Sequence, residues 1–204
     1  MTDFHTTSNN ITESRIIGLP TPEPRVLMHR RTFCYEVYER EDGLWDIDAQ
    51  MLDHKNRDIN VGGEARVLGQ PLHNMVVRLT LNSFMTIVAV HVTTLNAPYM
   101  TQCPSITDAY QKLVGLSVFK GFRKAVNELF SGTDGCTHIT ELANTLPTVA
   151  IQGIGTELAQ RMRAQNTEVG EIGGAKPFQL DQCHALSSSG EIAREFYPKW
   201  YVAK

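Results

Sequence analysis

The sequence predicts an α+β fold in which an antiparallel sheet of two hairpins is followed by helices packed on one face of that sheet. Three observations predict this fold. Apolar and polar residues alternate in the first half of the chain, turn-forming residues separate the alternating segments, and the apolar spacing lengthens to the helical period after Pro98. With 204 residues, of which 42% are hydrophobic, the chain is long enough for one well-packed domain.

The first hairpin is expected to begin near Arg30. Phe33, Tyr35 and Val37 alternate with other residues, and aromatic and β-branched side chains favour strands. A Glu-Asp-Gly turn then leads into a second strand over residues 44–52, and a loop with two adjacent glycines follows it.

The second hairpin is expected over residues 72–81 and 84–94, joined by an Asn-Ser turn. In its first strand Met75 and Val77 share one face, while Arg78 lies on the other. Two hairpins in succession are most simply combined as one four-stranded antiparallel sheet.

Helices are expected in the second half of the chain, where apolar residues recur at helical spacing. One helix begins near Ser105, and another covers residues 122–130. A third begins at residue 135 and runs toward residue 164, with Pro147 and Gly153 expected to bend or break it.

The two ends of the chain differ in character. Residues 1–24 are rich in Thr, Ser, Asn and Pro, which predicts a flexible arm, either disordered or laid across a second copy in a homodimer. Residues 25–204 are expected to form a single domain. Within it, residues 168–176 are Gly-rich and predict a loop, and the aromatic tail over residues 182–201 is expected to pack back onto the body.

Composition excludes several classes of partner. The net charge of −3 provides no broad positive field, which argues against nucleic acid or an acidic membrane as the main partner. No apolar run approaches the roughly 20 residues of a membrane-spanning helix. The polar N-terminus lacks the features of a secretory signal, so a cytoplasmic location is expected.

The cysteines are far apart in the sequence and form no CxxC pair. In a reducing cytoplasm they are expected to be thiols, and their spacing matches no standard zinc finger. These four residues are Cys34, Cys103, Cys136 and Cys183.

The strongest site signal is the segment GCTHITEL over residues 135–142. Cys136 falls at a helix start, where free backbone N–H groups favour negative charge, so its thiol is either a reactive group or a small buried residue. His138 and Glu141 are three residues apart on one helical face, so Glu141 could orient the imidazole.

Weaker candidates lie elsewhere in the chain. His73 stands at the mouth of a strand, where it is either a proton-transfer group or a hydrogen-bonded surface residue. His184 is a candidate ligand or acid/base, with Cys183 beside it expected in the core. Asp46 and Asp48 share a strand face, as either paired carboxylates or a solvated surface.

Five sequence blocks follow one another along the chain: EDGLWDID (41–48), PLHNM (71–75), LVGL (113–116), GCTHITEL (135–142) and DQCHAL (181–186). Together they resemble a bacterial family known as domain of unknown function 2889, over nearly everything after about Arg25. The chain departs from the family pattern at Ile139, where Leu is usual, and at Asn74, where Asp is common. Family members occur in bacteria that degrade lignin-derived aromatics, so the resemblance implies a lyase that releases formaldehyde from aromatic dimers.

The first functional hypothesis joins this resemblance to the acid/base residues. It is a cofactor-independent lyase acting on a phenolic dimer of the phenylcoumaran type, with His138 oriented by Glu141, His73, and Asp46 as a reserve base. The residues assigned to substrate binding are Arg78, Trp45, Tyr99, Cys136, His184 and Phe122.

Two other classes of function stay open. One is a protein that binds zinc or an iron–sulfur cluster, since mixed thiolate and imidazole ligands suit both. The other is a protein that binds small aromatic molecules without turnover. The metal-binding hypothesis uses Cys103, Cys136, His138 and either Cys183 or His184.

Overall fold

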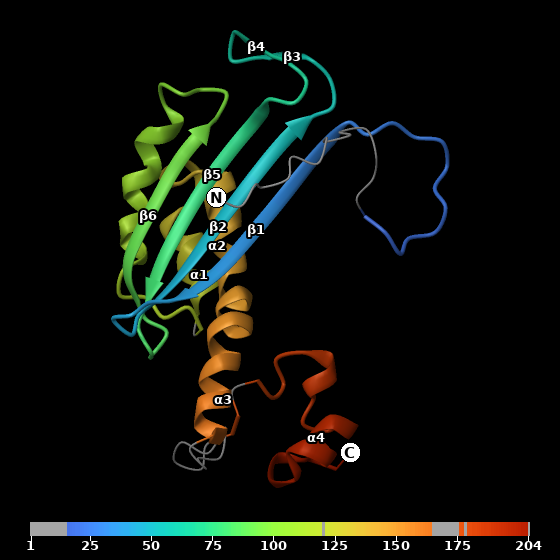
Figure 1. Ribbon diagram of the computed structural model, residues 1–204, viewed down its shortest axis with the longest axis vertical. Coiled ribbons are helices and arrows are strands. Elements are labelled where there is room, and N and C mark those ends of the chain that lie inside the picture. Colours follow the sequence, from blue (N-terminus) through green and yellow to red (C-terminus); the bar gives the residue numbers. More distant parts are fainter. Residues whose placement is uncertain (1–15, 120, 165–175, 178, 204) are drawn as a thin grey trace. The chain divides into compact units, whose positions relative to one another are not determined.

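A computed structural model describes residues 16–119, 121–164, 176–177 and 179–203 of the chain (Figure 1). The chain divides into two compact units, residues 1–152 and residues 153–204, and each is described by itself. The predicted α+β class is confirmed, because strands come first and helices follow them.

The first unit is built on a four-stranded antiparallel sheet in the order β1-β2-β5-β6. Both expected hairpins are present as neighbouring strand pairs, β1 with β2 and β5 with β6. The strands are β1 (His29–Glu39), β2 (Trp45–Lys55), β5 (Pro71–Leu81) and β6 (Ile87–Asn96).

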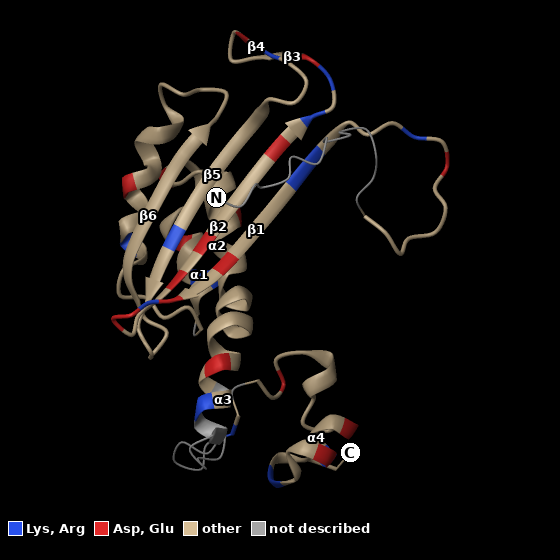
Figure 2. Cartoon of the chain, viewed as in Figure 1, with Lys and Arg blue, Asp and Glu red and all other residues tan. Residues whose placement is uncertain are grey.

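One face of this sheet forms the core. Burial alternates along β2, where every second residue from Trp45 to Asp53 is buried. Helix α2 (Thr137–Ala150) contacts β1, β2 and β5, and the 3-10 helix η1 (Cys103–Leu113) contacts β6 (Figure 1). The predicted packing of helices on one face therefore follows from the two-residue period of the strands. Charged residues of both signs are spread along the strands (Figure 2).

The segment expected as a loop forms a second, two-stranded sheet instead. Strands β3 (Ile59–Val61) and β4 (Glu64–Arg66) pair antiparallel around a two-glycine turn. Gly62 adopts a φ of 65°, and a Cβ atom there would lie 2.6 Å from the carbonyl oxygen of Pro98. Sequence reasoning recognised the turn but not the strands, because three residues are too few to display a period.

The helices follow the predicted order with one change of type. The first is η1, a 3-10 helix, and α1 (Phe122–Leu129) comes next. A short 3-10 turn, Gly132–Asp134, precedes α2. Helix α2 continues through Pro147, and the break comes afterwards as a π-helical turn, Ile151–Gly155, that contains Gly153. Proline lacks an N–H, so a disturbed hydrogen-bond pattern next to it is expected.

The second unit contains α3 (Thr156–Ala164), α4 (Glu191–Phe196) and two 3-10 turns, His184–Leu186 and Pro198–Trp200. Most of the Gly-rich loop lies outside the described residues, as does the arm up to residue 15; residues 16–24 contain no helix or strand. Packing of the aromatic tail onto the body stays a prediction. No described helix combines the length and apolar character needed to cross a membrane.

Candidate active site

Three charged or titratable residues form a row across three neighbouring strands. Arg31 of β1 is directly opposite Asp53 of β2, and Asp53 is directly opposite His73 of β5. Because Asp53 continues the buried series of β2, the row lies on the face of the sheet that the helices cover.

Asp53 is the centre of this row, and its side chain is only 2% exposed. Arg31 donates from Nε to one carboxylate oxygen at 2.8 Å and from a terminal nitrogen to the other at 2.7 Å. His73 donates from Nδ1 at 3.0 Å, and Nε2 of His29 lies 3.1 Å away. Burial by itself raises the pKa of Asp53, but the hydrogen bonds from Arg31 and His73 outweigh it and hold that pKa well below its usual range.

His138, from the first turn of α2, completes the cluster. Its ring stacks on the ring of His73, with 3.8 Å between centroids and 30° between planes. Its Nε2 lies 3.9 Å from Asp53. Burial, and then the positive charges of His73 and Arg31, lower the pKa of His138 to about 4, against the opposing effect of Asp53. His138 is therefore neutral near pH 7 and holds a free lone pair.

The position of His138 depends on how α2 begins. Cys136 is the N-cap residue, and its backbone N–H donates to the buried hydroxyl of Tyr110 at 2.9 Å. The Tyr110 hydroxyl also lies 3.0 Å from the carbonyl oxygen of Cys136 and 2.8 Å from the hydroxyl of Thr140. The Sγ atom of Cys136 is 3.9 Å from Nδ1 of His138. A tyrosine of η1 thus holds the turn that carries both predicted site residues.

Glu141 belongs to the cluster, but by a different route from the predicted one. Its carboxylate accepts a hydrogen bond of 2.5 Å from Arg31. Arg31 in turn holds Asp53, so Glu141 acts on the imidazoles through two other side chains. Among the interactions described for this part of the chain, none joins Glu141 to His138.

The pKa of His138 predicts how stability changes with pH. As the pH falls, His138 takes up a proton at a higher pH in the unfolded chain than in the folded chain. Between pH 6.5 and about 4, the free energy of unfolding therefore rises with pH. At about 1.4 kcal/mol per pH unit, the free energy of unfolding at pH 4 is lower than at pH 7 by an amount that approaches 3 kcal/mol. Solvent screening of the partly exposed ring reduces this loss to about 2 kcal/mol.

Urea unfolding at pH 7 and pH 4 measures this effect. The wild type should lose about 2 kcal/mol more than a His138→Gln variant between the two pH values. Asp53 contributes little in this window, because most of its own loss falls below its unfolded pKa of 3.8, and both proteins retain it. Equal losses in both proteins would contradict the assignment.

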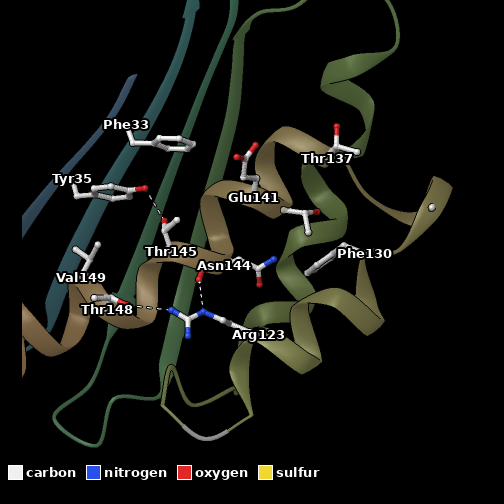
Figure 3. A pocket seen from close by; sticks show the side chains of 12 residues that line it. Phe33, Tyr35, Arg123, Phe130, Thr137, Glu141, Asn144, Thr145, Thr148 and Val149 are labelled. Carbon is white, nitrogen blue, oxygen red and sulfur yellow. Dashed lines mark hydrogen bonds between the residues drawn. The ribbon is translucent and has the colours of Figure 1, made fainter. Parts of the chain in front are cut away.

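A groove of about 900 Å³ runs along α2 (Figure 3). Phe33 and Tyr35 of β1 form one wall, and Phe130, just after α1, lies across from them. Thr137 and Glu141 also line it, so the groove passes the turn of α2 that carries His138. The volume is in the range of small-molecule sites.

Other predicted site residues lie away from this cluster. Asp46 accepts a hydrogen bond of 2.7 Å from Thr80, and Arg78 makes two of 2.6 Å to Asp48. Asp46, Asp48 and Arg78 have the opposite strand parity to Asp53 and His73, so they lie on the sheet face away from α2. The predicted shared face of Asp46 and Asp48 is correct, and Arg78 neutralises the second.

The aromatic residues expected to form a substrate slot are dispersed. Trp45 and Phe122 are buried in the core, and Tyr99 is exposed after β6. The aromatic wall of the groove consists of other residues, Phe33 and Tyr35, which the alternation of β1 placed on one face. The sequence predicted only that they belong to a strand, because half-buried and buried positions have the same alternating pattern.

Within the first unit, the described residues do not bring Cys103 together with Cys136 and His138 as one set of metal ligands. One group of three His, Cys, Asp or Glu with ligand atoms within 4.8 Å is found in the described part of the chain, namely Asp53, His73 and His138. Cys103 begins η1, while Cys183 and His184 belong to the second unit. All four cysteines are free thiols.

Sequence reasoning missed Asp53, Arg31 and His29. One signal for Asp53 was present, because it occupies the parity of Trp45, Ile47, Ala49 and Met51 and is thus a carboxylate on an apolar face. Such a residue must be paired with a partner when it is buried. No comparable signal identifies Arg31 or His29.

A family model described as "Protein of unknown function (DUF2889)" matches residues 29–152, which is more than half of the chain. The chain belongs to this family. The DUF2889 match begins at the first residue of β1 and includes all of α2, so it contains every residue of the cluster. No curated protein and no solved structure matches the chain.

Proposed function

We propose that this DUF2889 protein is an enzyme that performs acid/base catalysis on a phenolic aromatic dimer and releases formaldehyde from it as a lyase. The stacked pair of His73 and His138 around the buried Asp53 is the observation that carries the proposal. The identity of the leaving group comes from the resemblance to relatives in bacteria that degrade lignin-derived aromatics.

The pair is suited to hold one proton at a time. Asp53 accepts the Nδ1 proton of His73 and stabilises the positive charge of that ring. His138 is neutral near pH 7 because burial, and then the positive charges of His73 and Arg31, lower its pKa. His73 can therefore start as the acid and His138 as the base, and loss of the His73 proton removes one of the charges that depress the pKa of His138.

Two proton exchanges would complete the reaction on a phenylcoumaran carrying a hydroxymethyl group. First, His138 takes the phenol proton, and the bond between the saturated dihydrofuran carbon and the aryl oxygen breaks to leave a quinone methide. His73 protonates the released aryl oxygen. Next, the carbon–carbon bond breaks to release formaldehyde and its electron pair restores the aromatic ring. In the same step His73 takes the hydroxymethyl proton and His138 returns its proton to the developing phenolate, so the pair never carries two protons. This leaves a stilbene and the original pair.

Product analysis tests this proposal. Purified protein incubated with a phenylcoumaran dimer should form formaldehyde and the stilbene in equal amounts, measured by a colorimetric aldehyde assay and by ultraviolet absorbance. The proposal would be contradicted if formaldehyde and the stilbene formed no faster than in the protein-free solution. We include a cytoplasmic location in it, because four free thiols suit a reducing compartment.

A second candidate function is a metal centre at Asp53, His73 and His138, whose ligand atoms lie within 4.8 Å of one another. Two imidazoles and a carboxylate suit zinc or iron. The carboxylate already interacts with Arg31, His29 and His73, so a cation would have to displace part of this network. Metal analysis of the purified protein separates the two candidates: about one metal ion per chain favours the centre, and turnover that survives a chelator favours the proton pair.

A further inference from the structure

The groove along α2 has an unusual residue at the end farther from His138. Arg123 of α1 lines it and donates from Nε to the carbonyl oxygen of Asn144 at 2.9 Å. A terminal nitrogen of Arg123 donates to the hydroxyl of Thr148 at 3.1 Å, as Figure 3 shows. Both acceptors are neutral groups of α2, so they orient the guanidinium without neutralising it.

Two arginines of the sheet, by contrast, are neutralised by carboxylates. Arg31 pairs with Asp53 and Glu141, and Arg78 pairs with Asp48. In the described part of the chain, no ion pair is found for Arg123. A guanidinium has five N–H donors in a rigid fork, and the two contacts to α2 leave three of them for an anion.

The remaining walls of the groove suit aromatic rings. The rings of Phe33 and Tyr35 lie side by side on β1, with planes only 2° apart and centroids 6.3 Å apart. Phe130 lies across the groove from them (Figure 3). Flat walls of this kind favour planar ligands, which bury area without losing internal freedom.

The two ends of the groove differ in charge. Glu141 lines the end near His138, and Arg123 binds α2 at Asn144 and Thr148. Asn144 and Thr148 follow His138 by six and ten residues, so the cation lies about 9–15 Å along the helix axis from the imidazole, at 1.5 Å per residue. A ligand with its anionic group on Arg123 would extend past the aromatic wall toward the histidine pair.

We propose that the groove binds aromatic carboxylates, with the carboxylate on Arg123 and the ring against Phe33 and Tyr35. This inference rests on the proposed function for the reaction at the far end, and it specifies the substrate class as phenolic aromatics carrying an acidic side chain. At the other end Glu141 is already paired with Arg31, so no free cation competes there for the carboxylate and Arg123 sets the orientation of the ligand.

A matched pair of probes tests the inference by equilibrium binding, without turnover. 4-Hydroxycinnamate and 4-hydroxycinnamyl alcohol share the phenol ring and differ in the carboxylate. Isothermal titration should show that the wild type binds the acid about tenfold more tightly than the alcohol, since charge-assisted hydrogen bonds are the stronger kind. The preference should disappear in Arg123→Gln, with the affinity for the alcohol unchanged.

Lys124→Gln is the matched control, because Lys124 is the next residue of α1, is exposed and pairs with Glu128. It should keep the tenfold preference, and circular dichroism melting curves should show that both variants remain folded. Equal affinity of the wild type for the two probes, no binding of either, or a preference that survives in Arg123→Gln would each overturn the inference. Preference without formaldehyde release would contradict the lyase alone, and release without preference would contradict the groove assignment alone.

Discussion

Asp53→Asn is expected to lower the free energy of unfolding by about 3 kcal/mol, the lower end of the range for breaking a buried ion pair. The carboxylate is 2% exposed and holds Arg31, His29 and His73. The amide of asparagine has the same shape, but only its oxygen accepts hydrogen bonds and it carries no charge. The guanidinium of Arg31 therefore loses the negative charge that balances it. The value stays at the low end because Arg31 is 29% exposed and keeps Glu141 as a partner.

Asp48→Asn is a matched control for this measurement. Asp48 lies on the same strand and also makes a cross-strand pair with an arginine, at 2.6 Å to each carboxylate oxygen of Asp48. It differs in lying on the more exposed face, where such pairs are worth about 0.2–1 kcal/mol. Urea unfolding at pH 7 should therefore separate the two variants by about 2 kcal/mol or more. Equal losses would show that Asp53 contributes no more than a surface ion pair.

Substitution of either stacked histidine is expected to have the largest effect on turnover. His138→Ala and His73→Ala should each lower kcat for formaldehyde release by about 10²–10⁴-fold, the usual contribution of a general acid or base. The double variant should be little worse than either single one, because each step needs one ring to take a proton and the other to give one, so the two act as a unit. Formaldehyde and stilbene formation measure the effect.

Nuclear magnetic resonance titration provides a readout that a structural role alone would not change. In His73→Ala, the pKa of His138 should rise from about 4 toward 6.5, because the charge of His73 is one cause of its depression.

His91→Ala is the control for turnover, since His91 is exposed on β6. Turnover within a few-fold of the wild type in both single variants would contradict the assignment of acid and base.

Local patterns were sufficient for the elements themselves. The alternation of Met75 and Val77 predicted the strand β5, and the helical spacing after residue 135 predicted α2. The helix start at Cys136 followed from the turn before it, so a site at His138 could be inferred from neighbouring residues. These features depend on residues at most a few positions apart, and this is the range over which a period or a cap can be recognised.

The residues that contact His138 could not be predicted from local spacing. Asp53 meets Arg31 and His73 because β2 lies between β1 and β5 in a particular register, and a shift by one residue would turn Asp53 to the other face. The expected orienting role of Glu141 was drawn from helix spacing, which ignores the sheet beneath. In the structure Arg31 lies within reach of Glu141 and donates a hydrogen bond to its carboxylate.

The sequence alone therefore determined the α+β class, the order of the hairpins and helices, and the turn that carries Cys136 and His138. Tertiary structure alone decided that a buried aspartate joins the two histidines, that Asp46 and Arg78 lie on the other face, and that an aromatic groove with Arg123 runs alongside. The physical reason is that backbone periods are local, whereas the electrostatics of a buried carboxylate depend on which strands and helices enclose it.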